Sequence, residues 1–125
     1  MITTEGLDHK FIEKCVEHFC DLLDITVPNI FIFIDDTMKV LGACYENEPG
    51  DYMITLRDQA DGHMILALAH EMVHVKQFMC NSLSNTFDPT IPYNERWWEI
   101  EACEKEVVLM TSLINKVLDG TITKD

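Results

Sequence analysis

The chain has 125 residues, the length of one domain that can bury a core without help from disulfides. Hydrophobic residues make up 47% of it and charged residues 25%, which is typical of a folded globular protein and argues against disorder. Lys and Arg number 9 against 22 Asp and Glu, and the net charge of −13 argues against nucleic acid or an anionic membrane as a partner.

Several features concern the cellular compartment. The N-terminus, Met1 to Glu5, lacks the basic region and apolar run of a secretory signal, and no apolar stretch reaches the roughly 18 residues of a membrane span. The five cysteines include no Cys-x-x-Cys pair, and most have apolar neighbours, as is usual in a reducing compartment. We therefore expect a cytoplasmic protein, of bacterial or viral origin for example, with a single domain over residues 1–125.

The first half of the chain predicts one helix and three strands. Apolar residues recur at helical spacing over residues 7–23, and Pro28-Asn29 breaks this helix. Residues 30–34 are β-rich and apolar on both faces, as in a central strand. A turn at 35–37 leads to a second strand over 38–45, and a second turn, at 47–51, leads to an alternating, half-exposed strand over 52–56.

The second half predicts two helices. Residues 61–80 are apolar nearly all round, which favours a helix at the centre of the domain. A polar loop over 81–93 contains two prolines, and the last helix runs over 94–118 before Asp119-Gly120. The order α-β-β-β-α-α predicts a small α+β fold.

The central helix contains the motif His70-Glu71-Met72-Val73-His74. Two histidines four residues apart lie on one helical face and can both reach one metal ion. Glu71 points into the same cleft, where it can take a proton from a metal-bound water. Ionisable groups within a helix built for burial need partners, because burying them unpaired costs several kcal/mol. The motif therefore favours a metal site over two ordinary surface histidines.

A catalytic zinc usually takes a third protein ligand, and no histidine follows His74, so we expect a carboxylate or a cysteine. Helical phase separates the glutamates of the last helix. Glu99 shares an apolar stripe that is predicted to face the core, whereas Glu101 starts a polar stripe predicted to face solvent. The apolar stripe consists of Ala102, Cys103, Val107, Met110, Leu113, Ile114 and Val117. Glu99 is the predicted ligand and Glu101 the alternative.

Together these residues resemble the gluzincin metallopeptidases, and the short α-β-β-β-α-α order resembles their minimal, single-domain members. The resemblance rests on His70-Glu71-Met72-Val73-His74, on the following Gln77 and on Trp98-Glu99-Ile100-Glu101-Ala102, with 24 residues between His74 and Glu99. Family members carry the ligand glutamate in a Glu-x-x-Ala motif, often followed by Asp or Asn, which orients a ligand histidine. This chain has Cys103 there, so we expect either that another acceptor orients the histidine or that metal affinity and activity are lower.

The resemblance implies a Zn²⁺-dependent hydrolase that cleaves a bond in a peptide or protein substrate. His70, His74 and Glu99 are the implied zinc ligands, and Glu71 is the implied general base. Tyr93 is the first candidate for the donor that stabilises the oxyanion, followed by His63 and Tyr52. The strand over 52–56 is expected to be the sheet edge along which an extended substrate binds.

Two other classes of function remain open. In one, the zinc is structural and the domain is a non-catalytic interaction or assembly module. In the other, an interaction domain binds no metal at all. The metal content of the purified protein separates the second from the rest, and the effect of Glu71→Gln on activity separates the enzyme from the zinc-binding module. The sequence does not predict the oligomeric state.

Overall fold

The structure is a computed structural model that describes residues 2–4, 9–26, 29–35, 37, 39–59, 61–80, 83 and 90–123. Some sequence predictions fall outside these residues. They are the first two residues of the N-terminal helix, the break at Pro28, Asp36 in the first turn, Met38 at the start of the second strand, and most of the loop over 81–93.

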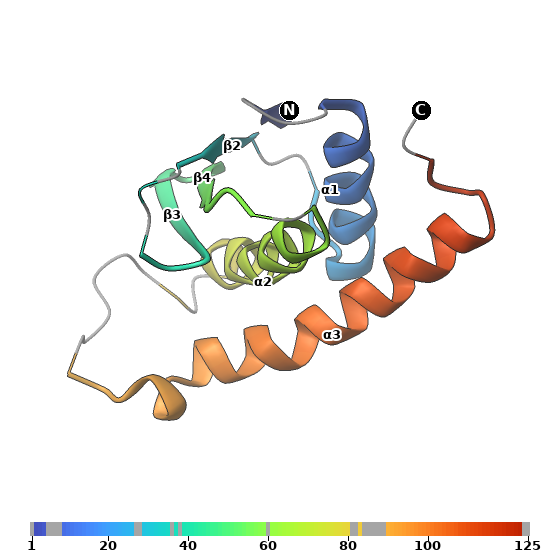
Figure 1. Ribbon diagram of the computed structural model, residues 1–125. Helices are drawn as coiled ribbons and strands as arrows, with labels where there is room; N and C mark the ends of the chain where they lie inside the picture. The colour runs from blue at the N-terminus through green and yellow to red at the C-terminus, as the bar shows by residue number, and fades with distance from the viewer. Residues whose placement is uncertain are drawn as a thin grey trace.

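Figure 1 shows the elements in chain order. They are β1 (Ile2–Thr4), α1 (His9–Leu23), β2 (Asn29–Ile34), β3 (Gly42–Glu48), β4 (Asp51–Leu56), α2 (Asp61–Met79), a 3-10 helix (Tyr93–Glu95) and α3 (Trp97–Leu118). The α+β class and the predicted order of one helix, three strands and two helices are confirmed. β1 is an additional strand, too short at three residues to show a periodic pattern.

Among the described residues, four strands form one mixed sheet in the order β1-β2-β4-β3. β1 and β4 both pair parallel to β2, whereas β3 pairs antiparallel to β4. The central position predicted for residues 30–34 is therefore confirmed. The prediction that residues 52–56 form the sheet edge is wrong, because β4 has neighbours on both sides. The edge strand on this side of the sheet is β3, which the turn at residues 49 and 50 connects to β4, and β1 forms the opposite edge.

The predicted bounds of two elements also need correction. The second strand was predicted over residues 38–45, but residues 39–41 bend and β3 begins only at Gly42. The last helix was predicted from residue 94, but Arg96 has an extended backbone (φ −77°, ψ 106°). This residue separates the 3-10 helix from α3, so the long helix begins at Trp97.

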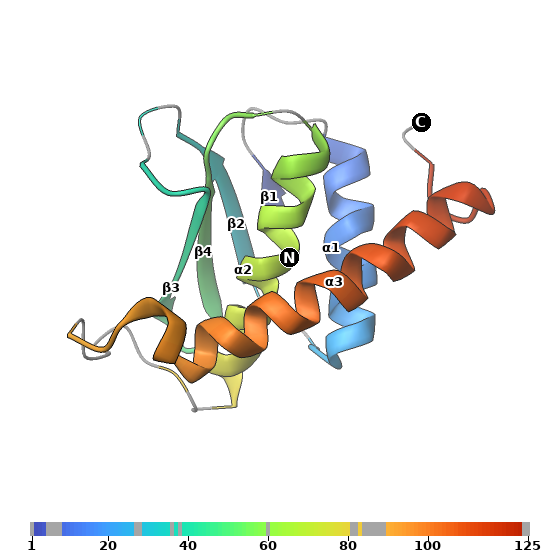
Figure 2. The same ribbon diagram turned by 60° about the horizontal axis from the view of Figure 1, so that its bottom comes forward.

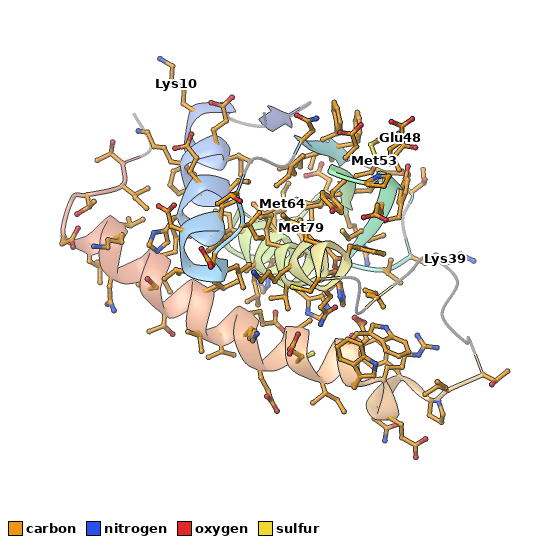
Figure 3. All side chains as sticks on the ribbon, turned by 180° about the vertical axis from the view of Figure 1, so that it is seen from behind. Lys10, Lys39, Glu48, Met53, Met64 and Met79 are labelled. Atoms are coloured by element: carbon orange, nitrogen blue, oxygen red, sulfur yellow. The ribbon has the colours of Figure 1, made fainter. Side chains whose placement is uncertain are left out.

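Helix α2 is the middle layer of the molecule. It contacts β3 and β4 on one side, α1 beside it and α3 on the other side. Figure 2 shows α3 crossing α2 on the side away from the sheet. In Figure 3, Met64 of α2 is buried and Met79 of α2 packs partly buried against the core, whereas Lys10 of α1 projects outward. A helix enclosed in this way needs apolar residues on every face, which explains the pattern over residues 61–80.

Helix α3 buries a narrower face than the sequence predicted. Its buried residues are Trp98, Ala102, Leu109 and Leu113, which face α2 and α1. Only Ala102 and Leu113 of the predicted core-facing stripe are among them. Cys103, Val107, Ile114 and Val117 are exposed, Val107 to 60%, so the prediction is wrong for these residues. The helix is apolar on its outer face as well, and apolar spacing alone does not show which face packs.

Across the described residues, we find no helix with the combination of length and apolar character that crossing a lipid bilayer requires.

Two neighbouring residues of α3 test its orientation. Leu109→Ala is expected to lower the free energy of unfolding by about 2–5 kcal/mol, because Leu109 is 2% exposed and its removal leaves a cavity. Val108→Ala is the matched control and is expected to change it by less than about 0.5 kcal/mol, because Val108 is 64% exposed. Urea denaturation measures both. Equal losses in the two variants would contradict the orientation.

Candidate metal centre

Helix α2 brings His70, Glu71 and His74 together near its middle. One ligand atom from each of these side chains lies within 4.8 Å of the others. The two imidazole rings meet edge to face, with 5.0 Å between their centroids. Glu71 and His74 are buried, and His70 is partly buried. The spacing of four residues therefore places both histidines on one face, as the motif predicted.

Glu99 reaches these histidines from the first turn of α3. Its Oε1 atom lies 3.3 Å from Nε2 of His70 and 2.5 Å from Nε2 of His74. The buried Trp98 beside it anchors this turn of α3 against the core. Nitrogen atoms of two imidazole rings and one carboxylate oxygen thus converge on one point.

Glu101, the alternative ligand, lies elsewhere. Its Oε1 atom accepts a hydrogen bond of 3.0 Å from Nε2 of Gln77, and its other oxygen lies 3.8 Å from the amine of Lys105. Among the described residues of α3, Glu99 is thus the glutamate that the structure brings to both histidines. Its role as a ligand stays a prediction.

Gln77 contacts the ring nitrogen of His74 that does not face Glu99. Its Oε1 atom lies 2.7 Å from Nδ1 of His74, and its Nε2 donates to the carbonyl oxygen of Trp98 at 3.0 Å. Because the amide oxygen can only accept, Nδ1 of His74 donates to it, and Nε2 is the ring nitrogen that faces Glu99 and that a metal ion would bind once it has lost its proton. Gln77 is 2% exposed, and it links His74 to the start of α3. The sequence marked this residue without assigning it a role.

Glu71 lies against the edge strand of the sheet. A Cβ atom on Gly42, the first residue of β3, would lie only 3.2 Å from both Cγ and Oε2 of Glu71. Glycine therefore allows β3 to approach the carboxylate closely. Burial raises the pKa of Glu71 to about 7, although His74 and His70 act in the opposite direction. A carboxyl group with a pKa near neutrality is suited to both accepting and donating a proton.

The histidines and Glu99 hold charge in the metal-free protein. Burial disfavours a charged imidazole, but the carboxylates of Glu99, Glu71 and Glu106 outweigh this effect and raise the pKa of His70 to about 9. The pKa of His74 is also raised, in spite of burial, chiefly by Glu99 and Glu71. Burial opposes ionisation of Glu99, yet hydrogen bonds from both histidines hold its pKa far below the usual range. The cluster is therefore built to accommodate positive charge.

These residues fit a zinc ion. Two neutral imidazole nitrogens and one carboxylate oxygen are a donor set that zinc takes in catalytic sites, where a fourth position stays open for water. Each histidine also presents its other nitrogen to an acceptor, Gln77 for His74 and Glu106 for His70, as metal-bound histidines usually do. The convergence of these donor atoms on one point is the observation that supports a divalent cation here.

The three candidate oxyanion donors lie in different places. Tyr93, in the 3-10 helix, is half exposed and hydrogen-bonds Glu99, so it lies at the centre. His63 lines the same cavity as His70. Tyr52 is 2% exposed in the inner strand β4, and its hydroxyl contacts Glu46 of β3.

Two cavities, of about 530 and 480 Å³, meet at the candidate centre. Val40, Gly42, Glu71, Tyr93 and Glu99 line both of them. The first extends between the N-terminal half of α2 and α3, and the second extends along β3 towards the start of α3. A groove therefore passes over Glu71 and Glu99 beside the edge strand.

No family model matches this chain, and neither does any curated protein or solved structure. The resemblance to gluzincins thus rests on the motif residues alone.

Glu99 and Glu101 give the test of the ligand set. Glu99→Ala is expected to weaken zinc binding by about 100-fold or more, because it removes the oxygen between both histidines. Glu101→Ala is expected to weaken it by less than about tenfold, because Glu101 contacts Gln77 and neither imidazole. Competition with a zinc chelator measures both affinities. Loss of zinc in Glu101→Ala with retention in Glu99→Ala would contradict this ligand set.

Proposed function

We propose that this chain is a zinc-dependent hydrolase that cleaves a peptide bond in a peptide or protein substrate. One observation supports the proposal above the others. A donor set suited to zinc lies beside a buried glutamate, in a groove that follows an exposed sheet edge. A structural zinc site needs no such groove and no such glutamate.

His70, His74 and Glu99 would hold the ion, with Gln77 fixing the ring of His74. A zinc ion bound there supplies a Lewis acid for the attacking water and for the scissile carbonyl group. Glu71 is not needed as a ligand, and its carboxylate lies beside the ligand cluster against Gly42. It is therefore free to act on protons.

Glu71 acts as the general base in this mechanism. Its carboxylate takes one proton from the attacking water while the water oxygen forms a bond to the carbonyl carbon. The same carboxyl group then gives the proton to the amide nitrogen as the C–N bond breaks. Tyr93 donates a hydrogen bond to the oxyanion of the tetrahedral intermediate, after exchanging its present acceptor, Glu99.

The substrate lies along β3 in this proposal. An edge strand offers unpaired backbone N–H and C=O groups, which an extended peptide can pair with as an additional strand. Residues 42–45 of β3 line the second cavity, so a peptide paired there passes directly over Glu71. Backbone pairing positions the scissile bond without demanding a particular side chain.

Glu71→Gln tests the mechanism. The variant keeps the shape of the side chain and loses the base, so it is expected to fold and bind zinc with wild-type affinity. Cleavage of a mixed peptide library, followed by mass spectrometry, is expected to slow by about 100-fold or more. Glu104→Gln, an exposed charge on α3, is the control and should cleave at the wild-type rate.

Two results would count against the proposal. Wild-type rates in Glu71→Gln would exclude Glu71 as the general base. A wild-type protein that binds zinc but cleaves no peptide or protein would instead favour the zinc-binding interaction module.

A further inference from the structure

His70 has a second ring nitrogen, and it faces a carboxylate that no role has yet explained. Nε2 of His70 points towards Glu99, whereas Nδ1 lies 3.4 Å from Oε1 of Glu106. Glu106 comes from α3, and its side chain is only 18% exposed. This distance is at the long end of the hydrogen-bonding range, and a partly buried carboxylate facing an imidazole needs such a partner.

The positions of Glu99 and Glu106 on α3 are matched. They are seven residues apart, which is two helical turns, so both project from the same side of α3 towards α2. Between them Ala102 packs into the core and is fully buried, and just beyond Glu106 Leu109 also packs there, at 2% exposure. Packing of α3 therefore fixes both carboxylates relative to His70.

Cys103 does not provide the acceptor. It lies one turn before Glu106 and is exposed, and its thiol hydrogen-bonds the carboxylate of Glu106. A thiol is a weak acceptor, whereas a carboxylate accepts strongly and adds an attractive charge. The carboxylate that contacts Nδ1 thus comes from Glu106, and the thiol of Cys103 hydrogen-bonds that carboxylate.

We propose that Glu106 is a positioning residue for His70, which accepts the Nδ1 proton and directs the Nε2 electron pair to the metal. This inference rests on the proposed zinc site. It assigns the two histidines different partners, a neutral amide from α2 for His74 and a carboxylate from α3 for His70. A carboxylate also makes the imidazole a stronger ligand, because it stabilises positive charge on the ring.

Glu106 is not itself a ligand of the same ion. The two nitrogens of an imidazole point in divergent directions, so an ion at Nε2 is out of reach of a carboxylate at Nδ1. A second ion between His70, Cys103 and Glu106 is the rival arrangement, since their ligand atoms lie within 4.8 Å of one another. It would require Nδ1 to lose its proton.

The experiment measures zinc affinity by chelator competition in four proteins besides the wild type. Glu106→Ala is expected to weaken binding about 10- to 100-fold, and Glu106→Gln less, because the amide oxygen still accepts a hydrogen bond. Glu104→Ala removes an exposed charge from the same helix and is expected to match the wild type. Adding Cys103→Asp to Glu106→Ala is expected to restore much of the affinity, because a carboxylate at position 103 can reach Nδ1.

The thermal midpoint of each metal-free variant, compared with the wild type, shows that the fold is retained. The absorption spectrum of the cobalt-substituted protein is expected to keep its intensity in Glu106→Ala, because the number of ligands is unchanged. That readout separates a positioning residue from a ligand.

Four outcomes would overturn the inference. If Glu106→Ala binds zinc with wild-type affinity, the proposed zinc site does not need Glu106 to position His70. A loss of affinity that Cys103→Asp does not restore would assign Glu106 a purely structural role. A second zinc equivalent that disappears in Glu106→Ala would favour the rival site. A wild-type protein that binds no zinc would overturn the proposed function itself, and this inference with it.

Discussion

A single carboxylate oxygen, Oε1 of Glu99, lies between the Nε2 atoms of His70 and His74 and connects α3 to α2. Three carboxylates and two imidazoles share this partly buried region, and each costs free energy unless positive charge balances it. The nearby carboxylates raise the pKa of both histidines, so in the metal-free protein protons on the rings balance part of this negative charge. A divalent ion would balance the same carboxylates without requiring protonated rings.

The surrounding fold brings these charged groups together. α2 carries the histidines and is enclosed by the sheet, α1 and α3, so its ligands are held on a rigid element. α3 adds Glu99 and Glu106 from one side of the helix, and the hydrogen bonds of Gln77 join its first turn to His74. The sheet contributes its edge strand, and Gly42 allows that strand to lie against Glu71. The sheet, α2 and α3 thus meet at one groove.

Local patterns in the sequence were sufficient to predict that the helices exist and that His70, Glu71 and His74 come together within α2. The bounds of α2 followed from its apolar pattern, and the juxtaposition of His70, Glu71 and His74 followed from their spacing. The proximity of Glu99 was also predicted from helical phase, yet the same stripe placed Val107 and Ile114 in the core, where they are not. Both faces of α3 are apolar, and only its contact with α2 decides which one is buried.

Features that depend on contacts between distant segments were not predictable in this way. β1 pairs with β2 although the whole of α1 separates them in the sequence, and the strand order β1-β2-β4-β3 places β3, not β4, at the edge beside Glu71. The acceptor for His70 depends on how α3 crosses α2, so the sequence indicated only that one was needed in place of Cys103.

X-ray absorption at the zinc edge, on protein loaded with one equivalent of zinc, tests the central claim most directly. The account predicts nitrogen and oxygen neighbours at about 2.0–2.1 Å, with the outer-shell pattern of two imidazole rings and no sulfur. A sulfur neighbour at about 2.3 Å would assign the ion to a cysteine such as Cys103, and failure to retain one equivalent of zinc would exclude the site. Either result would contradict a centre formed by His70, His74 and Glu99.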